Sequence, residues 1–202
     1  MGEREVQIPA GPSTLEGNLG LPDEAQRVVL FAHGSGSGRH SVRNRYVAEA
    51  LREAGLATLL MDLLLPEEEG VHLQMRHLRF DIRLLAERLV GATAWLAQEP
   101  NTQNLRVGYF GASTGAGAAL VAAAKRPEKV GAPTLLIVGG EDKPVIGMNE
   151  EVMEQLRAEK ELRIVPGATH LFEEQGKLEE VAHLAATWFT RYLGSASKAE
   201  AG

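Results

Sequence analysis

The stretch 105–125, LRVGYFGASTGAGAALVAAAK, limits the possible folds of this chain more than any other. It begins with a short apolar run, Val107–Phe110, which is typical of a buried parallel strand. It ends with Ala116–Lys125, which is nearly all Ala, Leu and Val and favours a buried helix. The G-x-S-x-G sequence Gly111–Gly115 lies between them. The stretch therefore predicts a strand that turns directly into a helix.

Such a sharp turn forces the residue at its apex, Ser113, into a strained backbone conformation. The turn fits only if the residues two before and two after it are small, and both are glycines, Gly111 and Gly115. The geometry lifts the serine hydroxyl clear of the sheet and points the first amides of the helix toward whatever the hydroxyl attacks. The pattern predicts a nucleophile elbow. The alternative is a glycine-rich turn in which Ser113 only caps the helix.

The rest of the chain predicts strands that alternate with helices after an antiparallel start. Glu3–Ile8 and Thr14–Leu21 form a candidate hairpin. Further strands are expected at Arg27–Ala32, Leu56–Asp62, Pro133–Val138 and Leu162–Val165, and helices at Ser41–Ala54, Leu73–Gln98, Asn149–Glu159 and Leu178–Leu193. This order predicts a three-layer α/β/α sandwich with a mostly parallel sheet. We expect one domain over residues 1–194 and a flexible tail over 195–202.

Polar loops follow four of these strands. They are His33–Gly38, Gly111–Gly115, Gly139–Asp142 and Gly167–His170. Functional groups in α/β folds gather at the carboxyl ends of the strands, so these loops are expected to lie together. A serine is too weak an acid to be nucleophilic alone and needs a base within hydrogen-bond reach.

Four motifs of the chain, HGSGSG, GASTG, GGEDKPV and GATHLF, resemble those of the α/β-hydrolase fold. The order Ser113, Asp142, His170 looks like its small, lidless dienelactone-hydrolase-like group, and the resemblance covers Val28–Leu193. It implies a triad in which His170 takes the proton of Ser113 and Asp142 orients the imidazole. It also implies that the backbone amides of Ser35 and Thr114 bind the oxyanion. The founding dienelactone enzyme carries a Cys nucleophile, and the Ser in its place here points to a general esterase.

Each assignment has a rival. His33 lies in the oxyanion loop and could be the base, but in this family the residue is structural. Glu141 could replace Asp142 as the acid, and His170 could be an ordinary loop histidine. Asp62 also ends a strand, yet it precedes the elbow, where this fold does not keep its acid. The remaining histidines are expected to be solvated or on a helix face: His40, His72, His77 and His183.

Composition narrows the function further. The net charge of −6 and the isoelectric point near 5.6 argue against nucleic acid or an anionic membrane as partner. The chain has no Cys, no ligand spacing for a metal and no phosphate loop, so we expect no metal or cofactor and a cytoplasmic protein. The resemblance implies hydrolysis of small carboxylic esters at an open site. A thioesterase or lactone hydrolase with the same triad, or an inactive, shortened or designed scaffold, remains an alternative.

The chain departs from the family pattern after the elbow helix. Other members have a further strand and helix before the strand that carries the acid, whereas here Ala124–Pro133 leads directly into that strand. A unit of on the order of 20–30 residues is missing. We expect the Pro133–Val138 strand to pair directly with Val107–Phe110. An edge that is internal in the family would then be open or paired with a second chain, giving a homodimer by sheet extension or exchange.

Overall fold

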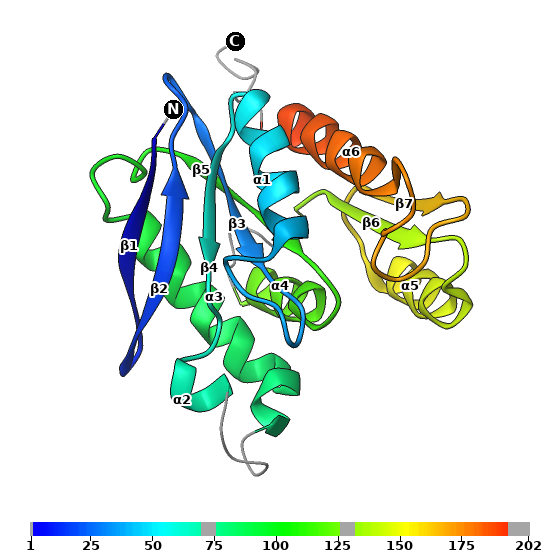
Figure 1. The fold of residues 1–202 in the computed structure, drawn as a ribbon, viewed down its shortest axis with the longest axis horizontal. Coiled ribbons are helices and arrows are strands. Elements are labelled where there is room, and N and C mark those ends of the chain that lie inside the picture. The colour runs from blue at the N-terminus through cyan, green and yellow to red at the C-terminus, as the bar shows by residue number, and fades with distance from the viewer. Residues whose placement is uncertain (1, 70–75, 126–131, 194–202) are drawn as a thin grey trace.

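The computed structural model describes residues 2–69, 76–125 and 132–193, and these form two sheets. The larger sheet has five strands, in the spatial order β1 (Glu3–Ala10), β2 (Ser13–Gly20), β4 (Ala57–Met61), β3 (Arg27–Ala32) and β5 (Arg106–Gly111). The smaller sheet consists of β6 (Thr134–Gly139) and β7 (Lys160–Val165). Figure 1 shows the smaller sheet beside the larger one, on the far side of β5 from the hairpin.

The strand directions agree with the sequence prediction. β1 and β2 form the expected antiparallel hairpin, and β2 pairs antiparallel with β4. β3 pairs parallel with β4 on one side and with β5 on the other, and β6 pairs parallel with β7. The fold is therefore an α/β sandwich with a mixed, mostly parallel sheet.

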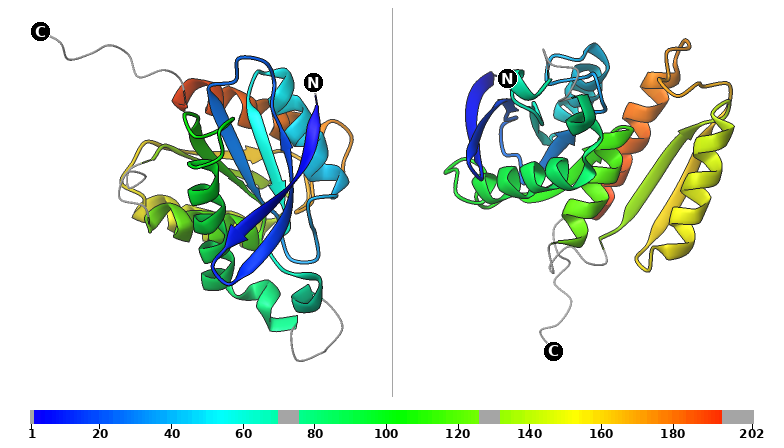
Figure 2. Two further views of the ribbon diagram at one scale, coloured as in Figure 1. Left: turned by 90° about the vertical axis from the view of Figure 1, so that its left-hand side faces the viewer. Right: turned by 90° about the horizontal axis from the view of Figure 1, so that it is seen from below.

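Helices cover both faces of the larger sheet (Figures 1 and 2). The helical segments are α1 (Val42–Glu53), α2 (Pro66–Glu69), η1 (Arg76–Phe80), α3 (Ile82–Leu96), α4 (Thr114–Ala124), α5 (Lys143–Gln155) and α6 (Lys177–Tyr192). Side chains of β3 alternate between the two layers. Leu30 packs in the cluster that includes α3 and α4, whereas Val29 and Phe31 pack in the cluster that includes α1 and α6. These two clusters are the three-layer core.

The expected pairing of the elbow strand with the acid-bearing strand is wrong. β5 pairs with β3, and β6 pairs with β7, but no ladder joins β5 to β6. β5 is consequently only half-buried between Val107 and Gly111, although its sequence predicts a fully buried strand. Although the chain is shorter than the family pattern, β5 and β6 do not form a hydrogen-bonded pair with each other. Figure 2 shows β6, β7 and α5 set apart from the five-stranded sheet.

The starts of two helices differ from the expectation. α5 begins at Lys143, directly after Asp142, rather than at Asn149, because a proline in the first turn favours a helix start there. In the expected helix Leu73–Gln98, α3 begins only at Ile82, where the Asp81 carboxylate accepts hydrogen bonds from the first helical amides. The part over residues 70–75 lies outside the described residues.

The acidic segment that begins at Pro66 makes specific contacts with the rest of the fold. Residues Pro66–Glu69 form a helical turn, and Glu68 accepts a hydrogen bond from the Leu65 amide. Its carboxylate also pairs at 2.8 Å with Arg88, a buried residue of α3. An acidic side chain of this segment therefore pairs with one nitrogen of a buried guanidinium.

The expected flexible tail, 195–202, falls outside the described residues, and the expectation of a single domain remains a prediction. Among the helices of the described ranges, none is long and apolar enough to cross a membrane.

Candidate active site

Ser113 lies at the turn between β5 and α4, in a conformation that non-glycine residues rarely adopt. Its φ is 52° and its ψ is −123°. The backbone is strained there, as the sequence predicts for an elbow. Ser113 occupies the N-cap position of α4, but its side chain makes no capping hydrogen bond. The alternative in which this serine only caps the helix is therefore not supported, and the hydroxyl is left exposed to solvent.

The two glycines of the elbow permit this turn. A Cβ atom at Gly115 would lie 2.0 Å from the carbonyl oxygen of Ala32, the last residue of β3. A Cβ atom at Gly111 would lie 2.5 Å from the Cα atom of Ala116. Both distances are far below contact between real atoms, so no side chain fits at either position.

The loop after β3 lies against the elbow. A Cβ atom at Gly34 would come within 3.2 Å of the Ser113 Cβ atom. The Ser35 amide donates a hydrogen bond of 2.9 Å to the Thr114 hydroxyl, which joins the two expected oxyanion-binding residues. Among the described residues, no acceptor takes the Thr114 amide hydrogen. One of the two amides is thus open to a ligand, and the other becomes so when the Thr114 hydroxyl turns away.

The loops after β6 and β7 bring Asp142 and His170 together. His170 Nδ1 lies 2.6 Å from Asp142 Oδ2, a short charge-assisted contact. The Asp142 side chain is 15% exposed and the His170 side chain 47% exposed. The largely buried carboxylate therefore contacts one ring nitrogen of His170, while the ring itself remains accessible to solvent. The other ring nitrogen, Nε2, is left available for another partner.

Two further residues position the histidine loop. A Cβ atom at Gly139 would lie 2.4 Å from the Ala168 carbonyl oxygen, so the glycine lets this loop pack against the end of β6. Glu174 accepts the Thr169 amide hydrogen at 3.1 Å on both carboxylate oxygens. These hydrogen bonds lower the pKa of Glu174 from its ordinary value. The carboxylate therefore remains ionised, and holds the residue before His170, throughout the neutral range.

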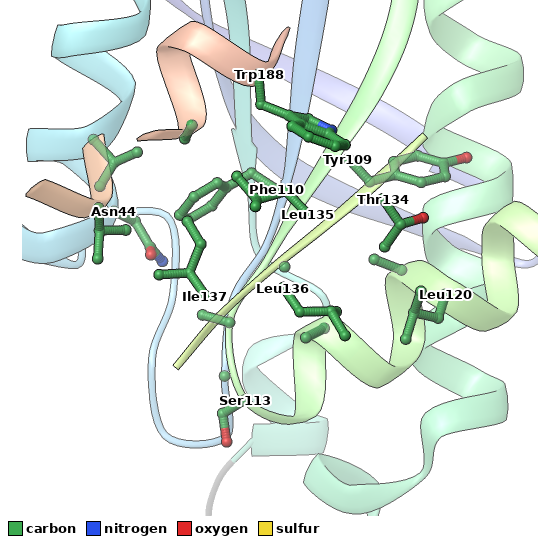
Figure 3. Close-up of a pocket in the computed structure, with 18 of the residues that line it drawn as sticks. Asn44, Tyr109, Phe110, Ser113, Leu120, Thr134, Leu135, Leu136, Ile137 and Trp188 are labelled. Carbon is green, nitrogen blue, oxygen red and sulfur yellow. The ribbon is translucent and has the colours of Figure 1, made fainter. Parts of the chain in front are cut away.

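Ser113, Asp142 and His170 all line one cavity of about 820 Å³ between the two sheets. Figure 3 shows Ser113 at one end of this cavity, with Phe110, Leu136 and Ile137 toward its middle. No hydrogen bond joins the Ser113 hydroxyl to the His170 ring, although both residues lie within the described ranges. The structure thus brings the serine and the Asp142–His170 pair to one cavity, without direct contact between them.

Two of the alternative catalytic residues, His33 and Glu141, do not take the predicted catalytic contacts. The ring of His33 is buried, with Nδ1 3.0 Å from the Gly34 carbonyl oxygen and Nε2 accepting the Leu63 amide hydrogen. It is a structural residue, as the resemblance implies. Glu141 is exposed, and its neighbour Asp142 has the contact to His170.

Asp62 forms an ion pair with Arg39 and accepts the Arg39 amide hydrogen. Burial lowers the pKa of Arg39, but the bonds and charges of Asp62 and Glu16 outweigh this and raise it overall. The histidines at 40, 77 and 183 are exposed, as expected, and His72 lies outside the described residues.

Sequence reasoning missed Glu174 and the apolar lining of the cavity. Glu174 looks like any surface acid in the segment LFEEQG, and only the fold places it against the amide before His170. The cavity was missed because it lies between strands that we expected to be paired.

Comparison with known proteins includes a match over nearly the full length of both chains at high identity. A solved structure of a dienelactone hydrolase from Anabaena variabilis is 58% identical, with a TM-score of 0.92 over 95% of this chain and 98% of that one. A serine hydrolase without a lid from Xanthomonas campestris is 19% identical, with a TM-score of 0.74 over 96% of each chain, and shares the fold. No family model matches the chain.

Two Mycobacterium tuberculosis proteins, provisionally named as phosphoribosyl transferases, are 53% identical over 211 residues. The match takes in 95% of this chain but only 47% of theirs, so the chain spans about half the length of these relatives. Since 95% of 202 residues is about 192, the 211-residue match contains about 19 positions at which this chain has no residue.

Proposed function

Because the chain belongs to the dienelactone hydrolase family of α/β-hydrolases, we propose that it is a serine hydrolase that cleaves small carboxylic esters through an acyl-enzyme on Ser113. The observation that supports this most is the 2.6 Å contact between His170 and Asp142, in the cavity that the strained Ser113 also lines. An imidazole oriented in this way is the base that a serine nucleophile needs.

In the first half of the reaction, Ser113 Oγ attacks the ester carbonyl carbon while its proton passes to His170 Nε2. Asp142 holds Nδ1–H and stabilises the imidazolium that forms. The carbonyl oxygen becomes an oxyanion, and the tetrahedral intermediate collapses as the alkoxide leaves with the proton of His170. The acyl group is then bonded to Ser113 Oγ.

In the second half, His170 takes a proton from water, and the oxygen of that water attacks the acyl carbon. The second tetrahedral intermediate releases the carboxylic acid and returns the proton to Ser113 Oγ. This half needs no group that the first half does not already use.

The oxyanion is stabilised by two backbone amides, one at the N-terminus of α4 and one in the loop after β3. The Thr114 amide is open to it, and the Ser35 amide joins when the substrate oxygen displaces the Thr114 hydroxyl. In subtilisin, the reference case for such sites, one oxyanion donor contributes about 2.7–4 kcal/mol to transition-state stabilisation.

Ser113 and His170 must approach each other for proton transfer. Catalytic hydrogen bonds are often long in ligand-free enzymes and tighten when substrate binds. The required movement lies between the two sheets, because the serine follows β5 and the histidine follows β7.

The test is a panel of p-nitrophenyl esters, thioesters and lactones, measured with the wild-type chain and with S113A. We expect turnover of acetate and butyrate esters that S113A loses. A preference for thioesters or lactones would identify the alternative substrate classes. Absence of turnover on all three would support the inactive scaffold.

The phosphoribosyl transferase name of the Mycobacterium relatives describes proteins about twice as long as the matched region. We attribute that activity, if present, to the part of those proteins that this chain does not match. The chain's own candidate site holds a serine, a histidine and a carboxylate rather than a phosphate loop. Incubation with phosphoribosyl diphosphate and free nucleobases should therefore give no nucleotide.

We further propose a cytoplasmic protein, consistent with a chain that has no cysteine. A small-molecule ester remains its expected partner. The homodimer expected from the shortened sheet also remains a proposal, which light scattering tests directly.

A further inference from the structure

One asparagine occupies a core position of the helix α1. The buried residues of this helix are Asn44, Val47, Ala48 and Leu51, which recur at the spacing of one helix face. The last three pack in the apolar cluster that includes α1 and α6. Asn44 is only 8% exposed, although it is not part of that cluster. A polar side chain therefore lies where packing alone would favour an apolar one.

The Asn44 carboxamide has no hydrogen-bond partner among the described residues, whose other buried polar side chains all have one. Those others are His33, Thr58, Arg88, Thr93 and Thr102. Only the backbone amide of Asn44 is paired, with the Ser41 hydroxyl that caps α1. Neither polar atom of the carboxamide is fully enclosed by protein, so both face open space. A buried polar group of this kind calls for a partner from outside the chain.

The open space beside Asn44 is the cavity that also holds Ser113. Figure 3 shows the carboxamide pointing from α1 into this cavity, on the side of Phe110 and Ile137. Phe110 packs against the same apolar cluster as α1, and it precedes Ser113 by three residues. Three residues of extended strand span about 10 Å. The carboxamide therefore lies several bond lengths away from the serine hydroxyl.

Two other polar side chains of the cavity wall already have partners within the chain. The Thr134 hydroxyl donates to the Ala132 carbonyl at 3.1 Å. The side-chain amide of Asn149 donates to the Val145 carbonyl, in its own helix, at 2.8 Å. Asn44 differs from both because its donor and its acceptor are still available to a ligand.

The chemistry of the carboxamide selects the ligand group. Nδ2 donates and Oδ1 accepts, and neither carries a charge. A hydroxyl group also donates and accepts, so it can pair with either atom. An anion would face the acceptor Oδ1 unfavourably, and the neighbouring guanidinium of Arg43 is already paired with Glu173 at 3.0 Å. An alkyl chain would cover the carboxamide without replacing its hydrogen bonds to solvent, which costs free energy.

We propose that Asn44 determines specificity, and that the chain prefers esters whose acyl part carries a neutral hydroxyl group several carbon atoms from the ester carbonyl. The inference rests on the proposed ester hydrolysis at Ser113. The acyl part occupies the cavity because it stays bonded to Ser113 Oγ, while the alcohol leaves beside the half-exposed ring of His170. The hydroxyl group then hydrogen bonds to the Asn44 carboxamide.

The test compares p-nitrophenyl esters that differ only at the end of the acyl chain. The ester of ω-hydroxyhexanoate ends in a hydroxyl group, that of heptanoate in a methyl group, and the monoester of adipate in a carboxylate. For the wild type, we expect kcat/KM to be about tenfold higher or more for the hydroxy ester than for the other two. The pair of ω-hydroxyoctanoate and nonanoate repeats the comparison with a longer spacer.

Two asparagine variants test the assignment. Asn44→Leu replaces the carboxamide by an alkyl group of similar volume, and it should lower the ratio of kcat/KM for the hydroxy ester to that for heptanoate about tenfold or more. Asn149→Leu is the matched control from the same cavity wall, and it should leave this ratio as in the wild type. Circular dichroism confirms folding, and Asn44→Leu should be at least as thermally stable as the wild type.

Binding to S113A separates this inference from the proposed function. Methyl ω-hydroxyhexanoate should raise the Tm of S113A more than methyl heptanoate does, and S113A/N44L should lose the difference. This result without any turnover by the wild type would overturn ester hydrolysis alone.

Three results would overturn the role of Asn44. The wild type could hydrolyse the esters with no preference for a hydroxyl group at either spacer length. It could prefer the adipate monoester, which would mean an anion site. Folded Asn44→Leu could also keep the wild-type preference, which would mean that another residue binds the hydroxyl group.

Discussion

The five-stranded sheet and the two-stranded sheet each supply part of one candidate site, but they are anchored very differently. The two apolar clusters of the core consist of residues from the larger sheet and its covering helices. Within the described part of the chain, neither cluster includes a residue of β6, α5 or β7, and α5 has no buried residue. Ser113 therefore follows a strand of a well-packed sheet, whereas Asp142 and His170 follow the strands of a lightly packed sheet. Stability and catalysis should respond differently to changes in the two regions.

The largest expected effect is on catalysis. Substitution of the catalytic residue in either region should cause an equal loss of kcat. S113A and H170Q should each reduce kcat by about 10⁴-fold or more, because serine and histidine act as one unit. The double variant should be no slower than either single variant. Steady-state ester hydrolysis measures all three, with circular dichroism as the control for folding. Additive losses would show that the two residues do not act together.

The next effect compares glycines of the two regions. Gly115→Ala should prevent the elbow from forming and reduce the folded population strongly, because its Cβ atom would overlap the Ala32 carbonyl. Gly147→Ala, in α5, meets no atom within 4 Å and should stabilise the helix by roughly 0.5–1 kcal/mol. Thermal unfolding measures both variants. A stable Gly115→Ala protein with full activity would contradict the elbow geometry.

A matched pair of leucines tests the difference in packing. Leu59 in β4 is fully buried in the core, and Leu59→Ala should cost about 2–5 kcal/mol of unfolding free energy. Leu136 in β6 borders the cavity, so Leu136→Ala removes fewer contacts and should cost less than half as much. Urea unfolding of the two variants gives the comparison. Equal costs would mean that β6 is packed as tightly as β4.

Part of this comparison was predictable from the sequence and part was not. The elbow glycines and the Ser113, Asp142, His170 order follow from local motifs, because steric limits on a turn act within five residues. The separation of β5 from β6 could not be predicted, because strand pairing depends on packing between distant segments. Nothing in the sequence shows whether β6 pairs with β5 or lies apart from it.

The helix α5 shows the same limit on a smaller scale. The apolar pattern favoured a start at Asn149, yet the helix begins at Lys143, after the Asp142 N-cap. The motif GGEDKPV points to a catalytic role for Asp142 and does not show that the same residue precedes a helix. The ion pair between Glu68 and Arg88 could not be predicted either, because the two residues lie 20 positions apart in the sequence.

The smallest expected effect concerns pH. Glu174 has a lowered pKa, so its hydrogen bonds to Thr169 are present above the ordinary carboxyl range and are lost only as pH falls through that lowered value. Between pH 5 and pH 8, we therefore expect these hydrogen bonds to stay in place, so the wild type and Glu174→Gln should show the same shape of pH dependence. Glu174→Gln should lower kcat a few-fold at every pH in this range. A ratio of the two activities that changes between pH 5 and pH 8 would contradict this expectation.

The most direct test of the account is covalent labelling with a fluorophosphonate, followed by intact mass spectrometry. Ser113 Oγ should displace fluoride from phosphorus and give one adduct per wild-type chain. S113A should give none, and H170Q should label at least a hundredfold more slowly, because the base on the smaller sheet is then missing. An unlabelled wild-type chain, or equal labelling of S113A, would contradict the claim that the two sheets together form a serine hydrolase site.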